Sequence, residues 1–346
     1  MAPHFNMQIL RPIKNTDFAA LKQIAIESGH GFTSLPVDDN LLQDKISRSE
    51  NSFSKHVETP FDEGYLFVLE DTKTNEIVGT TAIEAAVGTQ VPLYHYHLGK
   101  TVHHSSTLNV YNTVEILSMC NDYTGCSEIC TLFLREQYRK GLAGRFLSRI
   151  RFAFMADQSS RFSETVIAEM RGVSDAQGHS PFWQWLQEHF FSIEFPQADH
   201  LVGLGDKVFI SELMPKYPIY ANLLSDEAQA VIGHVHEKTK PALRLLQKEG
   251  FEHRGYVDLF DAGPTIEAKL DNIRTVQESY IVPVKIVDSV NCEQTYAISN
   301  QKLSDFKAVF TDNVLLDKKE LLLTIAREEA EALSLKNGDT VRIFAL

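Results

Sequence analysis

The sequence predicts an α+β fold in which helices flank a mixed β-sheet. Two apolar runs within residues 65–88 flank a short polar stretch, which is the pattern of an antiparallel hairpin. The apolar segment 127–134 leads through a glycine-containing turn into a helical pattern that starts at Leu142. Strands and helices then alternate to about residue 278, and such alternation places helices against a sheet.

The N-terminal part begins with a predicted strand at 7–11. A helix follows, with Thr16 as its predicted N-cap, and Gly29 ends it because glycine adopts the backbone conformation that stops a helix. We expect a loop at 29–36. A second amphipathic helix is predicted at 41–53, before the hairpin begins.

The middle of the chain continues the sheet. The hairpin at 65–88 is the clearest β signal, and 89–115 is interpreted as further strands and loops. After the strand at 127–134 and the helix that follows it, a strand at 165–170 and a helix at 180–191 are expected.

A further mixed segment predicts a strand at 207–214 and a helix capped by Ser225. The stretch 239–251 then reads as a helix with Thr239 as N-cap and Gly250 at its end. A strand and turn at 256–264 follow. These elements extend the α/β pattern beyond the first sheet.

The last 68 residues look different, because short β runs surround one predicted helix at 321–334. We therefore divide the chain into a region at 1–200, a second α/β segment at 201–278, and a small β-rich C-terminal region at 279–346. With 346 residues, the chain is long enough for about two domains of roughly 150 residues each.

Composition excludes several classes of protein. The formal net charge of −13 argues against general binding to nucleic acid or to an anionic membrane, because phosphates would be repelled. No run of about 18 apolar residues predicts a membrane-spanning helix. The N-terminus lacks the apolar core of a signal peptide, so a cytoplasmic location is expected.

Three of the four cysteines, Cys120, Cys126 and Cys130, fall within eleven residues. Their separations of six and four positions match neither a C-x-x-C motif nor a paired zinc-binding motif. Upstream histidines leave a metal site conceivable, but buried free thiols are the simpler interpretation. We expect no metal.

One stretch is strongly basic although the chain as a whole is acidic. Residues 135–152, REQYRKGLAGRFLSRIRF, hold six basic residues and one acid. A strand that ends in a glycine turn and opens a helix is suited to bind an anion, because the first helical N–H groups lack partners within the helix. Arg139, Lys140 and Arg145 would add charge there, whereas Arg149 and Arg151 lie further along the helix and are interpreted as solvated surface.

The turn favours a phosphate-bearing ligand, although a surface helix with an ordinary basic face would give the same pattern. Two common phosphate motifs are missing. The chain has no GxxxxGK[ST] motif of a P-loop, and no GxGxxG motif followed by an acid about 20 residues later.

Several long phrases follow one another over roughly residues 7–275, among them RPIKNTDFAALKQIA, AEMRGVSDAQGHSPFWQ, SDEAQAVIGHVH and LQKEGFEHRGYVDLFDAGPT. In these phrases and their order the chain resembles the arginine N-succinyltransferase family within the Gcn5-related acyltransferase fold. The C-terminal 70 residues resemble the family more weakly. The resemblance implies an acyltransferase-like mixed sheet in region 1–200, with coenzyme A bound there.

The resemblance also implies a reaction, in which succinyl-CoA and L-arginine give CoA and N2-succinyl-L-arginine. Succinyl-CoA would be a cosubstrate, and no permanently bound cofactor is expected. His236 matches the active-site histidine of the family, and Leu132 matches its contact with succinyl-CoA. The R-x-x-G-x-G turn that cradles pyrophosphate in acyltransferases corresponds here to a basic turn with Gly141 added and Leu142 in place of the middle glycine; its binding residues are Arg139, Lys140, Gly141, Ala143, Gly144 and Arg145.

The residues themselves support a role for His236. Acyl transfer to an amine needs a base for the ammonium proton and an acid for the departing thiolate, and an imidazole titrates near neutral pH and can serve either need. His234 has the same chemistry without the family match, and a solvated loop histidine is the simpler interpretation of either residue. A covalent route through Cys130 has no supporting Cys/His/Asn signature.

Other readings stay open at this point. Ornithine or another basic amino acid could be the acceptor, or the chain could be a weakly catalytic acyl-CoA-binding subunit of a heteromer. The guanidinium of arginine would need carboxylates, and the sequence does not choose among Glu84, Glu115, Glu128 and Glu169. A homo- or hetero-oligomer is what the resemblance implies.

Overall fold

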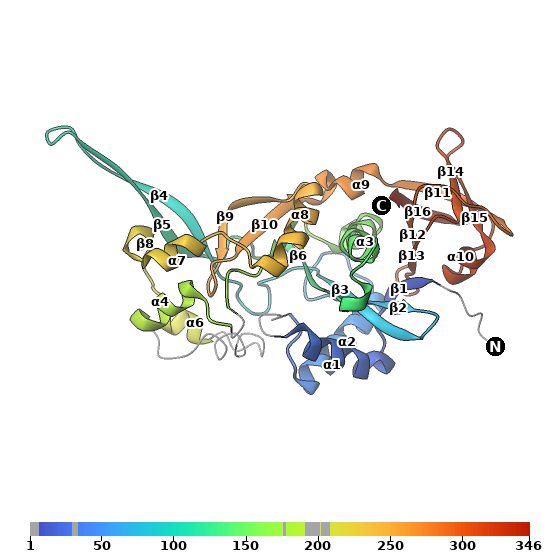
Figure 1. Cartoon of the computed structure of the whole chain (residues 1–346), viewed down its shortest axis with the longest axis horizontal. Helices are drawn as coiled ribbons and strands as arrows, with labels where there is room; N and C mark the ends of the chain where they lie inside the picture. The colour runs from blue at the N-terminus through green and yellow to red at the C-terminus, as the bar shows by residue number, and fades with distance from the viewer. Residues whose placement is uncertain (1–6, 30–33, 176–177, 191–200, 202–207) are drawn as a thin grey trace.

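The computed structural model describes residues 7–29, 34–175, 178–190, 201 and 208–346 (Figure 1). In these ranges sixteen strands form one continuous sheet, ordered β14-β15-β11-β16-β12-β13-β1-β2-β3-β6-β7-β10-β9-β4-β5-β8. Two neighbouring pairs, β6 with β7 and β11 with β15, are parallel, and the other described pairs are antiparallel. The predicted mixed sheet flanked by helices is therefore confirmed.

The first ten strands build the part of the sheet that surrounds the site. They are β1 (Gln8–Pro12), β2 (Gly64–Asp71), β3 (Glu76–Glu84), β4 (His95–Ser105), β5 (Val110–Cys120), β6 (Ser127–Leu134), β7 (Thr165–Glu169), β8 (Ile219–Tyr220), β9 (Glu252–Asp258) and β10 (Pro264–Lys269). The C-terminal strands are β11 (Tyr280–Val287), β12 (Tyr296–Asn300), β13 (Ala308–Thr311), β14 (Val314–Asp317), β15 (Leu322–Ala326) and β16 (Thr340–Ala345). Strand β13 pairs with β1, so the C-terminal region extends the same sheet.

Helices cover both faces of the central strands. They are α1 (Phe18–Ser28), α2 (Asp39–Ser54), α3 (Ala143–Asp157), α4 (Pro181–Phe190), α6 (Val208–Leu213), α7 (Asp226–Val231), α8 (Lys240–Lys248), α9 (Arg274–Glu278) and α10 (Arg327–Ala332). Helices α1 and α2 lie on one face of β1–β3, α3 lies on the other, and α8 packs beside α3 (Figure 1). The hairpin of β4 and β5 projects far from the body of the molecule.

Strand β2 shows why this arrangement needs helices on both sides. Its residues Leu66 and Val68 pack in the apolar cluster beneath α1 and α2, while Phe67 and Leu69 pack in the cluster beneath α3. Successive side chains of a strand point to opposite faces, so a strand that is apolar at every position must be covered twice.

Helix ends follow local side-chain chemistry. The carboxylate of Asp38 accepts a hydrogen bond from the N–H of Leu41 at the start of α2, and the hydroxyl of Ser225 accepts one from Ala228 at the start of α7. The predicted cap at Ser225 is therefore confirmed. Thr16 is not the cap of α1, because residues Asn15–Asp17 first form a short 3₁₀ turn and Asp17 is the N-cap of the helix.

Two predicted elements are wrong. The segment predicted as a strand at 207–214 contains helix α6, in which Ile210 is buried, and Met214, four residues later and just after the helix, is buried as well. The segment predicted as a helix at 321–334 begins with strand β15, and α10 starts only at Arg327. Leu323 and Ile325 alternate with half-buried neighbours once β15 pairs with β11, and this pairing determines the strand.

A buried carboxylate connects four distant elements. Glu249, which follows α8, is 1% exposed, and its Oε1 lies 3.0 Å from Nε of Arg149 on α3 and 2.7 Å from Nη2 of Arg274 on α9. The N–H and hydroxyl of Thr275 donate to its other oxygen at 2.8 and 2.6 Å. Arg149 also donates to the carbonyl of Ala345 on β16 at 2.6 Å, so the network attaches the C-terminal region to α3.

We expect Glu249→Ala to lower the free energy of unfolding by about 3–5 kcal/mol, because it leaves the buried guanidinium of Arg149 without its counter-charge. Urea denaturation measures the change. Glu252→Ala is the matched control, since Glu252 pairs with Arg254 on the exposed surface and such pairs contribute about 0–1 kcal/mol. Equal effects of the two substitutions would contradict a structural role for the network.

Candidate functional site

Strands β6 and β7 are neighbours only where they begin. Ser127 pairs with Val166 and Glu128 with Ile167, and the remaining six residues of β6 have no partner on β7. Helix α3 connects the two strands and packs across them. The sheet therefore opens into a wedge whose wall is the outer half of β6.

A bulge lies in that exposed half of β6. Thr131 and Leu132 together face the single residue Thr81 of β3, because the pairing shifts register between Thr80 and Ala82. Thr131 has a φ of 52°, which is unusual for a β-branched residue, and its carbonyl accepts a hydrogen bond from the Thr80 hydroxyl at 3.0 Å. Backbone strain of this kind is found where a strand must present its groups to a ligand.

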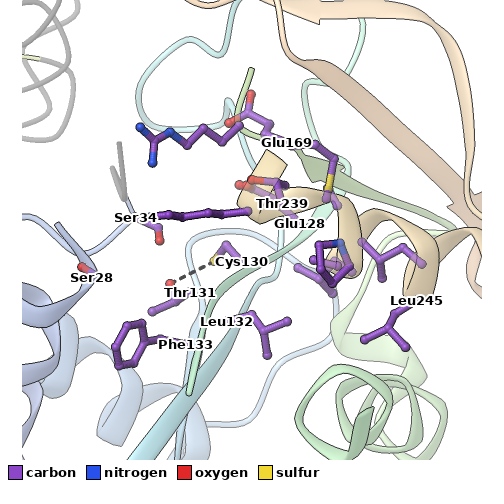
Figure 2. A pocket seen from close by; sticks show the side chains of 18 of the residues that line it. Ser28, Ser34, Glu128, Cys130, Thr131, Leu132, Phe133, Glu169, Thr239 and Leu245 are labelled. Atoms are coloured by element: carbon purple, nitrogen blue, oxygen red, sulfur yellow. Dashed lines mark hydrogen bonds between the residues drawn. The ribbon is translucent and has the colours of Figure 1, made fainter. Parts of the chain in front are cut away.

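The wedge is the entrance of a cavity of about 1260 Å³. Figure 2 shows Leu132, Thr131 and Cys130 of β6 along its wall, with Thr239 and Leu245 from the region of α8 facing them. The cavity is large enough for a ligand of coenzyme A size, since drug-sized ligands occupy pockets of roughly 300–1000 Å³.

One end of the cavity is basic and opens at the start of α3. Gly141 has a φ of 77°, and α3 begins at Ala143 without a side-chain cap, so no side chain satisfies its first N–H groups. Arg139 lines the cavity, donates from Nε to the carbonyl of Leu134 at 2.7 Å, and lies over the ring of Phe133. This end has the charge and the free N–H groups that an anion needs.

The predicted binding residues fall into two groups. Leu132, Arg139 and Gly144 line the cavity itself. Lys140, Gly141 and Arg145 are exposed beside its mouth, whereas Ala143 is 3% exposed and packs into the core beneath α3. Six of them form one contiguous turn before and at the start of α3, and Leu132 lies apart from it on β6.

The opposite end of the cavity is acidic. It is lined by Glu128 on β6, Glu169 at the end of β7, Asp258 at the end of β9 and Asp261 after β9. Figure 2 shows Glu128 and Glu169 on the same side of β6 as Thr239. Burial and the Glu169 carboxylate raise the pKa of Asp258. A cationic ligand would stabilise these closely placed acids.

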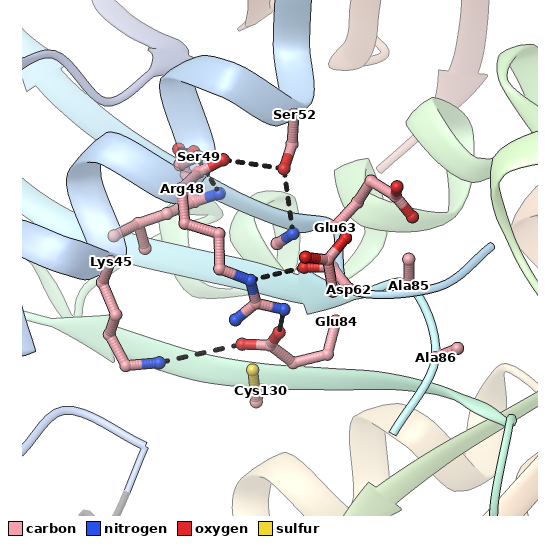
Figure 3. A network of polar contacts seen from close by, with 12 residues as sticks. Lys45, Arg48, Ser49, Ser52, Asp62, Glu63, Glu84, Ala85, Ala86 and Cys130 are labelled. Atoms are coloured by element: carbon pink, nitrogen blue, oxygen red, sulfur yellow. Dashed lines mark hydrogen bonds and ion pairs between the residues drawn. The ribbon is translucent and has the colours of Figure 1, made fainter. Parts of the chain in front are cut away.

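The other two acids considered from the sequence do not line the cavity. Glu84 lies between Arg48, 2.5 Å away, and Lys45 (Figure 3). Burial opposes its ionised form, but these two cations outweigh burial and lower the pKa of Glu84. Glu115 is exposed on β5, paired opposite Lys100 in the projecting hairpin.

His236 does not itself line the cavity, but it contacts Arg171, which does. It is half-buried, its N–H donates to the carbonyl of the cavity residue Arg171 at 2.9 Å, and its Nδ1 accepts from the N–H of Lys238 at 3.1 Å. Burial and the positive charges of Arg171 and Lys238 lower its pKa. His234, by contrast, is exposed, with Nδ1 2.9 Å from the carbonyl oxygen of Ile232.

The sequence analysis did not identify three residues of the cavity wall, which are Asp258, Asp261 and Arg151. Asp258 and Asp261 stand at the end of a predicted strand, and this position was the signal that could have found them. The interpretation of Arg149 and Arg151 as solvated surface is wrong, because they are 4% and 2% exposed. Arg151 follows the apolar residue Leu147 by four positions, which places both on one face of α3.

The described residues give little support to a cysteine nucleophile or to a metal site. Burial raises the pKa of the Cys130 thiol, which disfavours the nucleophilic thiolate. All four cysteines are free. Within the described ranges no group of three or more histidine, cysteine or acidic residues is placed to hold a metal ion, and none of the helices there has the length and apolar character needed to cross a bilayer.

Comparison with known proteins decides the family. A family model described as arginine N-succinyltransferase beta subunit matches residues 8–275, and the model of that subunit's C-terminal domain matches residues 281–345. The chain belongs to the arginine N-succinyltransferase family. Family members that it resembles include the arginine N-succinyltransferases of Photorhabdus laumondii, 45% identical over 342 residues, and of Yersinia enterocolitica, 44% identical over 343 residues; each match covers 98% of both chains.

A solved member of the family has the same architecture. The structure of arginine/ornithine succinyltransferase subunit AI from Pseudomonas aeruginosa matches with a TM-score of 0.90 and 36% identity, over 98% of this chain and 99% of the other. The acyltransferase-like fold class predicted from the sequence is therefore confirmed.

We expect Lys140→Ala and Arg145→Ala each to weaken binding of succinyl-CoA by about 1–3 kcal/mol, the range for charged hydrogen bonds. The loss should shrink in high salt, because the cations are exposed. Isothermal titration calorimetry with succinyl-CoA and with a succinyl-pantetheine thioester separates the phosphates from the rest of the donor. Lys100→Ala, on the exposed hairpin, is the control and should leave both affinities unchanged.

Equal losses for the two donors would contradict this assignment. The turn would then hold some other part of the ligand.

Proposed function

We propose that this protein transfers the succinyl group of succinyl-CoA to the α-amino group of L-arginine. One observation carries the proposal: a single cavity joins a basic helix start to a cluster of acids, with an opened β-strand between them. The basic end suits the phosphates of a CoA thioester, and the acidic end suits a cationic acceptor. The names of its relatives agree with both substrates.

In this proposal the donor lies along β6. Its pyrophosphate contacts the turn at 139–145, and its pantetheine arm follows the half of β6 that β7 leaves uncovered. The thioester then lies near the bulge at Thr131 and Leu132. The main chain of Leu132 would bond the pantetheine amides, because the wedge leaves that edge of β6 open.

The acceptor would enter from the acidic end. We assign its guanidinium to Glu128, Glu169 and Asp258, which line that end together. A single carboxylate can bind a guanidinium through two parallel hydrogen bonds, whereas an ammonium group makes a point contact. Ornithine is the second candidate acceptor, because the solved relative is named for both amino acids.

His236 would donate a hydrogen bond to the thiolate as it departs, and the N–H proton that the attacking amine loses on forming the amide would end on that thiolate, which leaves as the CoA thiol. Because Nδ1 accepts a hydrogen bond from the N–H of Lys238, the proton of the neutral ring is on Nε2, which is free to donate. A neutral imidazole can donate a hydrogen bond to a developing negative charge. The lowered pKa keeps the ring in this neutral form at physiological pH.

The remaining sequence expectations are unchanged by this proposal. A cytoplasmic location, an oligomeric state and the division at residues 200 and 278 stay predictions.

The proposed function predicts thiol release from succinyl-CoA that depends on arginine. A colorimetric thiol reagent measures it, with ornithine as second acceptor and norleucine as control. Norleucine lacks the positive charge and cannot form ion pairs with the acids at this end, so we expect its kcat/KM to fall at least 100-fold below that of arginine. A comparable kcat/KM for norleucine would exclude the acidic end as the acceptor site.

For His236 we expect His236→Ala to lower kcat by about 10²–10⁴ with little change in succinyl-CoA affinity. The wild-type kcat should fall only below the ordinary histidine pKa of about 6.5, because burial and neighbouring cations lower the pKa of His236, and protonation of Nδ1 then breaks the hydrogen bond from Lys238 that orients the ring. Stopped-assay kinetics across pH 5–8 measure both effects.

His234→Ala is the matched control, since this exposed histidine lies two residues away. Equal losses of kcat in the two variants, or a fall in wild-type kcat that begins well above pH 6.5, would contradict the role assigned to His236.

A further inference from the structure

Two arginines on α3 are both buried, but they differ in their hydrogen-bond and ion-pair partners. Arg149 is 4% exposed and pairs with Glu249, Thr275 and the carbonyl of Ala345. Arg151, two residues later, is 2% exposed, and its bonds within the described chain go only to Ser148 of its own helix turn: Nε to the carbonyl at 3.1 Å and Nη2 to the hydroxyl at 3.4 Å.

Arg151 is unusual among the buried arginines of the described chain. Arg342 pairs with Asp157 at 2.8 Å, and Arg161 donates to two carbonyls and the hydroxyl of Tyr65. Arg151 forms no ion pair with any described carboxylate, and its Nη1 has no hydrogen-bond partner there. Burial lowers its pKa to about 10, and the Cys130 thiol is the one described titratable group that offsets this effect.

An uncompensated buried charge is costly to keep. Replacing such a group by an apolar side chain of similar volume is commonly neutral or stabilising, so the fold gains nothing from this guanidinium. Arg151 does line the cavity, however, and its face lies over the ring of Phe152. A guanidinium that is dehydrated in advance and open to a cavity is suited to bind an anionic ligand.

The position of Arg151 identifies which part of the ligand it meets. Its electrostatic neighbour Cys130 precedes the bulge at Thr131, where the proposed donor places its thioester. The phosphates are held at the start of α3, two helical turns away along the chain. The acids at the other end of the cavity would repel a second carboxylate, so the free end of a dicarboxylic acyl chain must turn away from them.

We propose that the Arg151 guanidinium binds the terminal carboxylate of the succinyl group and so selects a dicarboxylic acyl donor. This inference rests on the proposed function, and it adds the residue that distinguishes succinyl-CoA from a neutral acyl-CoA. A guanidinium binds a carboxylate through two parallel hydrogen bonds, which fixes the direction of the acyl chain as well as its charge. Arg151 is a specificity-determining residue in this role.

The other arginines of the cavity wall either have protein partners or belong to the basic turn. Arg135 pairs with Glu27 at 3.1 Å, and Arg139 belongs to the basic turn. Arg171 donates to the hydroxyl of Ser174 at 2.8 Å and lies next to His236. Arg171 is the rival for the succinyl carboxylate and is therefore included in the experiment.

The test compares succinyl-CoA with butyryl-CoA, which has the same four-carbon chain without the carboxylate. Thiol release in the presence of arginine gives kcat/KM for both donors. Arg151→Met should lower kcat/KM for succinyl-CoA about 100-fold and leave that for butyryl-CoA within about threefold, since only the charged hydrogen bonds are lost. Arg151→Lys keeps the positive charge but lacks the two parallel N–H donors of a guanidinium, so it should lower kcat/KM for succinyl-CoA about tenfold.

Two further variants complete the comparison. Arg149→Met removes the other buried arginine of α3, whose partners lie outside the cavity, and Arg171→Met removes the rival; both should leave the ratio of the two donors unchanged. An unchanged ratio in Arg151→Met, an equal loss for both donors, or a collapse of the ratio in Arg171→Met instead, would overturn the assignment. If Arg151→Met does not fold, Arg151→Lys carries the test through the same ratio.

The experiment distinguishes failure of the proposed function from failure of the role assigned to Arg151. Wild-type protein that releases no thiol from succinyl-CoA with arginine or ornithine refutes the reaction itself. Wild-type activity together with an unaltered donor ratio in the Arg151 variants refutes only the role of Arg151.

Discussion

The early separation of β6 from β7 is the constraint on which the site depends. After two paired residues the strands part, and α3 fills the space between them from one face. This places a helix start, an open strand edge and the end of β7 around one cavity. The bulge at Thr131, held by the hydroxyl of Thr80, fixes the direction in which β6 leaves its partner.

Burial assigns different tasks to similar charges. Glu249 and Arg149 neutralise each other where α3, α8, α9 and β16 meet, and this pair stabilises the junction with the C-terminal region. Arg151 has no such partner and faces the cavity. A charge that is satisfied within the protein supports the fold, whereas one left unsatisfied beside a cavity is available to a ligand.

Much of the fold could be predicted from the sequence. The hairpin of β2 and β3, the strand before the basic turn and the helix after it follow from apolar periodicity and turn residues, which act locally. Strand β15 was mistaken for a helix because its apolar run has no period of its own. Its partner β11 decides the conformation, and that partner lies about 40 residues away.

By itself the sequence determined the family, the strand–turn–helix that carries the basic residues, and His236 as the histidine to test, because each is a local pattern of residues. Only the tertiary structure brought Asp258 beside Glu169, moved Glu84 into an ion pair outside the cavity, and separated Arg151 from Arg149. The reason is physical: charge, burial and pairing depend on which groups meet across the fold, and two residues on one helix turn can face different surroundings.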